Sequence, residues 1–313
     1  MIHAFALEPN LVATWGRRDA FRFFHDKFGL GTPRVLLELP LFKNWKRDVY
    51  RAANDLNLSQ EDMKRIEELF RMFGEHKCRR VDSVYDGLLS WIENAEREYD
   101  RKPFAAILAS QNPRRHVAVI EGEHLDLGTA RWDCPTGATL ARTPASFAAA
   151  LSAMLLNCTE LHLVDPHFGP ENRRHRIMLE ALMDVLSKNG ITPDVIRVHC
   201  SGKSDLAFFE QQASRMAAYL SASVCIEFQR WDERDGGEKL HNRYVLTDLG
   251  GVSLGIGLDE GESGQTDDVL LLPRAQYEFR WSQYVSDDGS FRQVDSPPAV
   301  QGRRALPSSK GNA

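Results

Sequence analysis

The chain has 313 residues, which is long enough to bury one large hydrophobic core or two smaller ones. Its 42% hydrophobic and 27% charged residues are typical of a globular protein, and no run approaches the roughly 20 apolar residues that a membrane span requires. The formal net charge of −5 excludes a strong overall attraction to nucleic acid or to anionic membranes. Any polyanion would therefore have to be bound by a local basic patch.

The cysteines and the N-terminal segment indicate a reducing environment. Five cysteines are widely spaced and form no CxxC pair, which argues against a zinc site, and their odd number fits a reducing cytoplasm. The segment MIHAFALEPN has no basic region followed by an apolar core, so we expect no secretory signal. The sequence thus predicts a cytoplasmic protein that works without a cofactor.

Residues 1–143 are expected to form a mainly helical N-terminal domain with a few strands. Ser59, followed three residues later by Asp62, is typical of a helix N-cap. Helices are expected over 43–54, 59–73 and 81–100, and strands over 34–41, 104–109 and 116–120. The segment 122–143 is rich in Gly, Pro and Asp, and it is the candidate linker.

From residue 144 to residue 295 helices and strands alternate. Such alternation predicts an α/β domain in which helices flank a largely parallel or mixed sheet. Helices are expected over 145–156, 173–188, 205–220 and 275–285, and strands over 161–168, 194–199, 223–229, 240–247, 252–258 and 268–272. The tail from residue 296 is rich in Pro, Ser, Gly and basic residues, and we expect it to be disordered.

The segment KLHNRYVLTDLGG carries the residue types that phosphoryl transfer needs. On a strand, His241 and Arg243 would point to the same face, and Asp248 would follow at the strand end. A neutral imidazole can attack phosphorus or exchange protons near neutral pH. A fixed guanidinium can hold the non-bridging oxygens, and a carboxylate can orient the imidazole.

This spacing resembles the signature of the phospholipase D superfamily, which is H-x-K, four residues, D, six residues, then G-S. His241, Arg243, Asp248 and Gly255 occupy the corresponding positions, although Arg243 stands where the family has Lys and Ile256 where it has Ser. The family's later asparagine falls near Asp259. The upstream LVDPHF also resembles the family's early strand, so the likeness covers about 140 residues.

The resemblance implies a phospholipase D-like fold and a metal-independent phosphodiesterase that forms a phosphohistidine at His241. A nuclease is preferred to a lipase because the chain has no evident amphipathic membrane helix, so a nucleic acid is the expected partner. Because there is a single motif, the resemblance implies a homodimer in which two copies of His241 face each other. It also suggests a role in prokaryotic defence, with the N-terminal domain selecting substrate or a partner protein.

Two other functions remain open at this stage. The substitutions at Arg243 and Ile256 would suit a catalytically inactive member that serves as a binding or assembly module. The third possibility is an enzyme that processes phospholipids.

Further candidate residues lie at predicted strand and helix ends. Asp165 and His167 close a predicted strand, where ligands collect in α/β sheets, or they cap and pack the next segment. Arg173 and Arg174 begin a helix, where they line a polyanion groove or are solvated. Gly255 and Asp259 complete the candidate substrate-binding set. The SGKS segment at 201–204 lacks the first glycine of a P-loop, so we exclude nucleoside triphosphate binding there.

Overall fold

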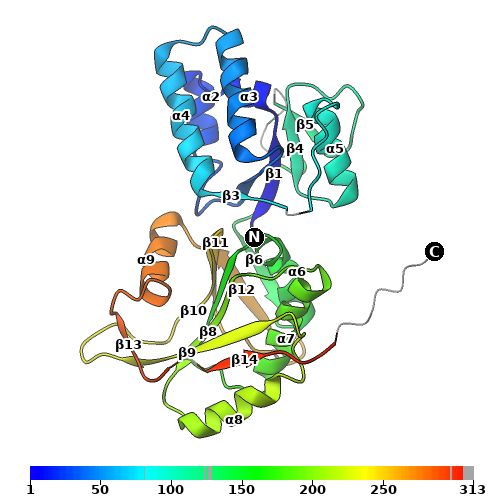
Figure 1. Cartoon of the computed structure of the whole chain (residues 1–313). Coiled ribbons are helices and arrows are strands. Elements are labelled where there is room, and N and C mark those ends of the chain that lie inside the picture. The colour runs from blue at the N-terminus through cyan, green and yellow to red at the C-terminus, as the bar shows by residue number, and fades with distance from the viewer. Residues whose placement is uncertain (81, 123–124, 126–128, 297, 306–313) are drawn as a thin grey trace, which may run out of the picture. The chain divides into compact units, whose positions relative to one another are not determined.

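The computed structural model describes residues 1–80, 82–122, 125, 129–296 and 298–305. It divides into two compact units, the first unit at 1–136 and the second unit at 137–313. No helix among the described residues combines the length and the apolarity needed to cross a bilayer. Each unit has its own sheet, as Figure 1 shows.

The first unit is built on five strands, all parallel, in the order β3-β2-β1-β4-β5. The strands are β1 (His3–Leu7), β2 (Arg34–Leu37), β3 (Lys77–Cys78), β4 (Ala106–Ala109) and β5 (Val119–Glu121). The helices are α1 (Pro9–Thr14), α2 (Arg18–His25), α3 (Phe42–Asp55), α4 (Gln60–Glu75) and α5 (Trp91–Arg101). Helices contain more residues than strands, as expected, but the strands form one continuous parallel sheet that the sequence analysis does not anticipate.

Local sequence explains where the helices of the first unit begin. Ser59 and Asp62 form the expected reciprocal capping box, and α4 starts directly after it. A second capping box, between Ser90 and Glu93, starts α5. The helix expected over 81–100 therefore begins only at Trp91, and residues 82–90 contain turns and irregular backbone but no helix.

The second unit contains a mixed sheet in the order β13-β9-β8-β7-β10-β11-β12-β6, with β14 also paired to β9. The strands are β6 (Gly137–Ala141), β7 (Glu160–Val164), β8 (Val195–Ser201), β9 (Cys225–Glu233), β10 (Arg243–Thr247), β11 (Gly250–Leu254), β12 (Thr266–Leu271), β13 (Phe291–Gln293) and β14 (Ala299–Gln301). The helices are α6 (Pro144–Leu155), α7 (Arg173–Lys188), α8 (Leu206–Met216) and α9 (Arg274–Tyr284). The α/β class predicted for this region is confirmed.

Two segments of the second unit differ from expectation. The candidate linker contains β6, which pairs with β12, so the structural unit begins at Gly137. The tail expected to be disordered from residue 296 instead contains β14, and Arg304 makes an ion pair with Glu180 at 2.6 Å. Backbone pairing and this ion pair hold a segment whose composition is typical of disorder. Residues 306–313 lie outside the described part of the chain.

Candidate functional site

Strand pairing brings distant parts of the second unit to one edge of its sheet. β10 is antiparallel to β7, so Arg243, at the amino end of β10, lies beside the carboxyl end of β7. β11 is antiparallel to β10, with Leu254 opposite Arg243. The residues that follow β7 and β11 therefore meet Arg243 at the same edge, where α/β sheets commonly bind ligands.

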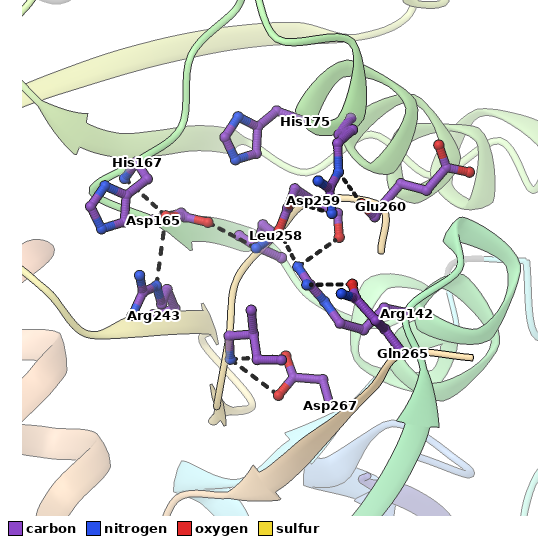
Figure 2. Close-up of polar contacts among 12 residues, drawn as sticks. Arg142, Asp165, His167, His175, Arg243, Leu258, Asp259, Glu260, Gln265 and Asp267 are labelled. Atoms are coloured by element: carbon purple, nitrogen blue, oxygen red, sulfur yellow. Dashed lines mark hydrogen bonds and ion pairs between the residues drawn. The ribbon is translucent and has the colours of Figure 1, made fainter. Parts of the chain in front are cut away.

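Asp165 lies at the centre of this edge and is 1% exposed (Figure 2). Its carboxylate accepts a hydrogen bond from the His167 backbone amide at 2.9 Å and another from the Leu258 backbone amide at 2.8 Å. Arg243 Nε lies 3.9 Å from Asp165 Oδ1, and this nitrogen makes no hydrogen bond to the described residues. Asp165 is thus engaged internally and fixes both the loop after β11 and the arginine of the motif.

The loop after β11 approaches Asp165 so closely that only glycine fits at residue 257. A Cβ atom added at Gly257 would lie 2.9 Å from Asp165 Oδ2 and 3.3 Å from Asp259 Oδ1. Both carboxylates are held by other partners and cannot easily move away. The absence of a side chain at Gly257 therefore lets two acidic residues and Arg243 gather around one point.

Asp259 is held by two arginines. It forms a short hydrogen bond with the buried Arg142, and Arg174 Nη2 lies 3.3 Å from its other oxygen. Arg174 also donates to the backbone carbonyl of Glu260. Arg174 and Asp259, which the sequence suggests as substrate ligands, bind each other in the structure. The side chain of Arg173, by contrast, is 74% exposed, and its Nη1 makes only a long contact with Glu260, at 4.0 Å.

His175 is a buried residue of the same cluster that the sequence analysis does not select. Its Nδ1 accepts a hydrogen bond from the Gly169 backbone amide at 3.2 Å. Burial lowers the pKa of His175, against the opposing attraction of Asp165 and Asp259. The imidazole therefore contributes here mainly as a neutral acceptor that fixes the turn before α7.

The glycine of the motif has a structural role. Gly255 donates its backbone N–H to Asp267 Oδ1 at 2.9 Å, and Ile256 donates to both oxygens of the same carboxylate at 3.1 Å. A Cβ atom at Gly255 would lie 2.7 Å from Asp267 Oδ1. The buried carboxylate of Asp267 thus occupies the amides at this turn, so they are not free for substrate. The side chain of Ile256 is 47% exposed.

The sequence predicts that His241 lies on a strand, but in the structure it lies before the strand begins. Residues 240–241 form a turn in which the His241 amide donates to the Lys239 carbonyl at 3.1 Å, and β10 starts only at Arg243. The alternation of a pleated strand therefore does not apply between His241 and Arg243. The imidazole of His241 is exposed and makes no hydrogen bond or ion pair with the described residues.

Asp248 lies at the other end of β10. Its carboxylate accepts hydrogen bonds from the Thr159 amide at 2.8 Å, the Thr159 hydroxyl at 2.9 Å and the Glu160 amide at 3.1 Å. Five strand residues separate the two ends, a length of roughly 17 Å. The expectation that Asp248 supports the imidazole of His241 is therefore wrong for this arrangement, because Asp248 fastens the start of β7 instead.

A hollow of about 260 Å³ lies at the carboxyl ends of the parallel strands β7 and β8. Its polar side chains are those of His167, Lys203, Ser201, Ser204 and Glu171. It is also lined by Leu240, the residue before His241, and by Pro166, Phe168, Gly169 and Phe209. Lys203 is exposed and makes no side-chain hydrogen bond or ion pair with the described residues. The hollow thus combines an ammonium, an imidazole and two hydroxyls, which can bind an anion, with the carboxylate of Glu171.

The structure adds Lys203 and Ser204 to the candidate site. The SGKS segment was set aside because it does not complete a P-loop. The position of this segment at the end of a predicted strand, beside the end of the strand that carries Asp165, is the sequence signal that could have identified it. Arg142 and Asp267 carry no comparable signal. The partner of Arg142 is Asp259, 117 residues later in the chain. Asp267 binds the turn at Gly255, which lies 12 residues earlier, directly after β11.

The chain was compared with known proteins at three levels. No family model and no curated protein matches it. Among solved structures, a phospholipase D family member, Nuc from Salmonella typhimurium, covers 52% of this chain and 100% of its own at 10% identity and a TM-score of 0.34. The fold is similar to that of a phospholipase D family member.

Two further solved structures are similar. NucT from Helicobacter pylori covers 50% of this chain and 96% of its own, at 12% identity and a TM-score of 0.33. TrmBL2, described as an archaeal chromatin protein with a novel mode of DNA binding, covers 54% of this chain and 57% of its own, at 9% identity and a TM-score of 0.28.

Proposed function

We propose that the second unit is a phosphodiesterase of the phospholipase D type that cleaves nucleic acid through a phosphohistidine at His241. The observation that carries this proposal is the position of His241. Its neighbour Leu240 lines a hollow at the carboxyl ends of two parallel strands, and that hollow contains Lys203, His167 and two serines. The proposal is that the imidazole of His241, the residue after Leu240, reaches a phosphate that Lys203 and the two serines hold in this hollow.

The reaction would proceed in two balanced steps. A ring nitrogen of His241 attacks phosphorus, the P–O bond to the leaving nucleotide breaks, and a second imidazole gives its proton to the leaving oxygen. Water then attacks the phosphohistidine, loses a proton to that second imidazole, and releases His241. Lys203 and the outer nitrogens of Arg243 would hold the non-bridging oxygens.

Two histidines can supply the second imidazole. The resemblance assigns it to His241 of a second copy, which requires a homodimer. The chain itself offers His167, which is exposed and lines the same hollow. Sedimentation of the intact protein, together with activity of a His167→Gln variant, distinguishes the two assignments. A role in prokaryotic defence and a cytoplasmic location stay predictions.

The internal ion pairs of the site favour a second candidate function. Asp165 faces Arg243, and Arg174 is held by Asp259, so two of the expected phosphate-binding cations are already engaged. A module that binds nucleic acid through the remaining exposed cations, without cutting it, would have this arrangement.

The proposal is tested with purified protein and labelled single- and double-stranded DNA and RNA, in buffer containing EDTA. We expect cleavage by the unaltered protein and by the control His25→Ala, which changes an exposed histidine of the first unit. His241→Ala should lose at least about a thousandfold in rate, because it removes the nucleophile. Acid-labile phosphate should be trapped on His241 after brief exposure to substrate.

Other results would replace this proposal. Equal cleavage by His241→Ala and by the unaltered protein would exclude the phosphohistidine. Binding without cleavage would establish the second candidate. Activity that disappears on chelation and returns with magnesium would identify a different mechanism, and activity confined to choline lipids in micelles would identify a phospholipid-processing enzyme.

A further inference from the structure

The first unit has a sheet whose strand order, β3-β2-β1-β4-β5, reverses direction between β1 and β4. Open parallel sheets of this kind bind ligands outside the carboxyl ends of their strands. At the reversal itself, the Glu8 carboxylate accepts a hydrogen bond from the Ser110 amide at 2.6 Å, which bridges the gap between the two strands.

A cavity of about 310 Å³ lies at the carboxyl ends of β2 and β3. It is lined by Glu38, Leu39, Pro40 and Leu41 after β2, by Asn44 in the first turn of α3, and by Arg79, Arg80, Ser83 and Tyr85 after β3. This volume is at the lower end of the range for small-molecule sites. It suits a ligand of the size of one nucleotide.

Most polar side chains of this cavity have no hydrogen-bond partner. Among the described residues, Asn44, Arg79, Ser83 and Tyr85 make no side-chain hydrogen bond or ion pair. Arg80 is the exception, because Glu98 and the carbonyls of residues 102 and 103 hold it. A set of convergent donors and acceptors without internal partners is typical of a binding site.

Glu38 is the most informative of these groups. It is the first residue after β2, its side chain is only 10% exposed, and its carboxylate accepts no hydrogen bond from the described residues. Among the described residues it makes one ion pair, with Lys77 Nζ at 3.8 Å. The Glu38 carboxylate therefore has no hydrogen-bond donor from the described residues and is available to a ligand that enters the cavity.

The charges of the cavity restrict the ligand. A simple anion would be repelled by Glu38, and a simple cation would be repelled by Arg79 and Arg80. A ligand with hydroxyl groups for the carboxylate and an anionic group for Arg79 satisfies both. In sheets of this topology an acidic residue near the end of the second strand hydrogen-bonds ribose hydroxyls. Here the sequence after β1 is Glu8-Pro9-Asn10 and contains no glycine-rich phosphate-binding loop. Arg79 is therefore the group of the cavity that would bind the phosphate.

We propose that this cavity binds a phosphorylated ribose, which is presented either by a free ribonucleoside monophosphate or by the 3′-terminal nucleotide of an RNA. Glu38 accepts hydrogen bonds from the ribose hydroxyls, Arg79 binds the phosphate, and the Tyr85 ring with Leu39 and Leu41 provides the apolar wall. The site belongs to the first unit and does not depend on the activity proposed for the second.

The experiment measures binding to the full chain by calorimetry. The probes are AMP, 2′,3′-dideoxy-AMP, and a short RNA that ends in either a free 3′ diol or a 3′ phosphate. We expect the diol probes to bind and the dideoxy analogue to bind at least about tenfold more weakly, because it cannot donate to Glu38. Arg79→Ala should weaken binding at least about tenfold, whereas Arg18→Ala, an exposed arginine of α2, should not change it.

The two sources and the failure of the proposal give different results. Tighter binding of AMP than of RNA identifies the free nucleotide, and tighter binding of diol-ended RNA identifies the RNA terminus. No binding of any probe, equal binding of the dideoxy analogue, or equal effects of Arg79→Ala and Arg18→Ala would overturn the proposal. Glu38→Gln should abolish the preference for the diol while the melting temperature stays close to that of the unaltered protein. His241→Ala should bind normally, which separates this site from the proposed nuclease.

Discussion

The two units place an acidic residue at the same kind of position and use it differently. Asp165 follows β7 and Glu38 follows β2, and both side chains are largely buried at the carboxyl end of a parallel strand. Asp165 accepts two backbone hydrogen bonds and faces Arg243. Among the described residues, Glu38 accepts no side-chain hydrogen bond and makes one ion pair, with Lys77 at 3.8 Å. The position of an acid in the topology therefore does not decide its role, and the decisive property is whether the protein already supplies its partners.

The same difference extends to the cations. In the second unit, Arg142 and Arg174 are bound to Asp259, so the edge carries less free positive charge than its arginine count suggests. In the first unit, Arg79 has no such partner among the described residues. The cations at this edge that can bind a polyanion therefore include the exposed Arg173 and Lys203 and the outer nitrogens of Arg243.

The largest expected effect comes from removing the two acids in turn. Asp165→Ala should lower the free energy of unfolding by about 3 kcal/mol, because it leaves the His167 and Leu258 amides without their acceptor and removes the negative charge that faces the partly buried Arg243. Glu38→Ala should change it by less than about 1 kcal/mol, because no internal hydrogen bond is lost. Urea titration of each variant measures both values. Similar losses for the two variants would show that Glu38 is a structural acid like Asp165 and would break the comparison.

A second effect concerns the interior of the second unit. His162 Nδ1 and His199 Nε2 lie 3.0 Å apart, and the Trp231 indole N–H donates to His199 at 3.0 Å. Burial lowers the pKa of His162 to about 4 and also lowers the pKa of His199, so both stay neutral in the folded protein. The unfolded chain takes up protons on these groups from about pH 6.5 downward. Their contribution to stability is therefore complete above pH 6.5 and is lost as the pH falls toward 4.

The expected size of this loss is on the order of 3 kcal/mol for His162 alone between pH 6.5 and 4. Urea titrations at pH 7 and pH 5 should show it as a lower midpoint at pH 5. In His162→Gln the midpoint should depend less on pH, whereas in the control His167→Gln, which changes an exposed histidine, the dependence should stay the same. An unchanged pH dependence in His162→Gln would mean that other groups cause the loss.

The smallest expected effect separates two adjacent arginines at the start of α7. Arg174→Ala should lower the free energy of unfolding by about 1 kcal/mol, because it breaks the contacts with Asp259 and Glu260. Arg173→Ala should change the free energy of unfolding by less than about 0.5 kcal/mol. It should weaken nucleic-acid binding, and the slope of the logarithm of the binding constant against the logarithm of the salt concentration should decrease by about the amount expected for one phosphate contact. Filter binding at several salt concentrations measures the second effect. Loss of binding in Arg174→Ala alone would reverse these roles.

The sequence predicted those features that depend on neighbouring residues. The α7 helix has the predicted bounds, and α4 starts at the predicted capping box of Ser59 and Asp62. The alternation of helices and strands also predicted the α/β class of the second unit. Capping and periodicity are local, so one sequence is sufficient to find them.

Features that depend on distant partners were not predicted. β1 and β3 were missed, because short strands become recognisable only when they pair with strands far away in the chain. The spacing of the motif predicts that Asp248 orients His241. In the structure the Asp248 carboxylate instead accepts hydrogen bonds from the backbone amides of Thr159 and Glu160, about 90 residues earlier. Spacing in a motif specifies which residues are present, whereas their partners are set by the register of the sheet.

The short strand β6 has a practical consequence for dissecting the protein. Its residues Gly137–Ala141 pair with residues 266–270 of β12, although the composition of this stretch suggests a linker. A shortened protein that starts at Pro144 would leave the hydrogen-bonding groups of β12 open to other molecules, and such open edges promote aggregation. Asp267, which secures the turn at Gly255, lies on that strand. Cutting before Gly137 keeps the edge closed and the turn supported.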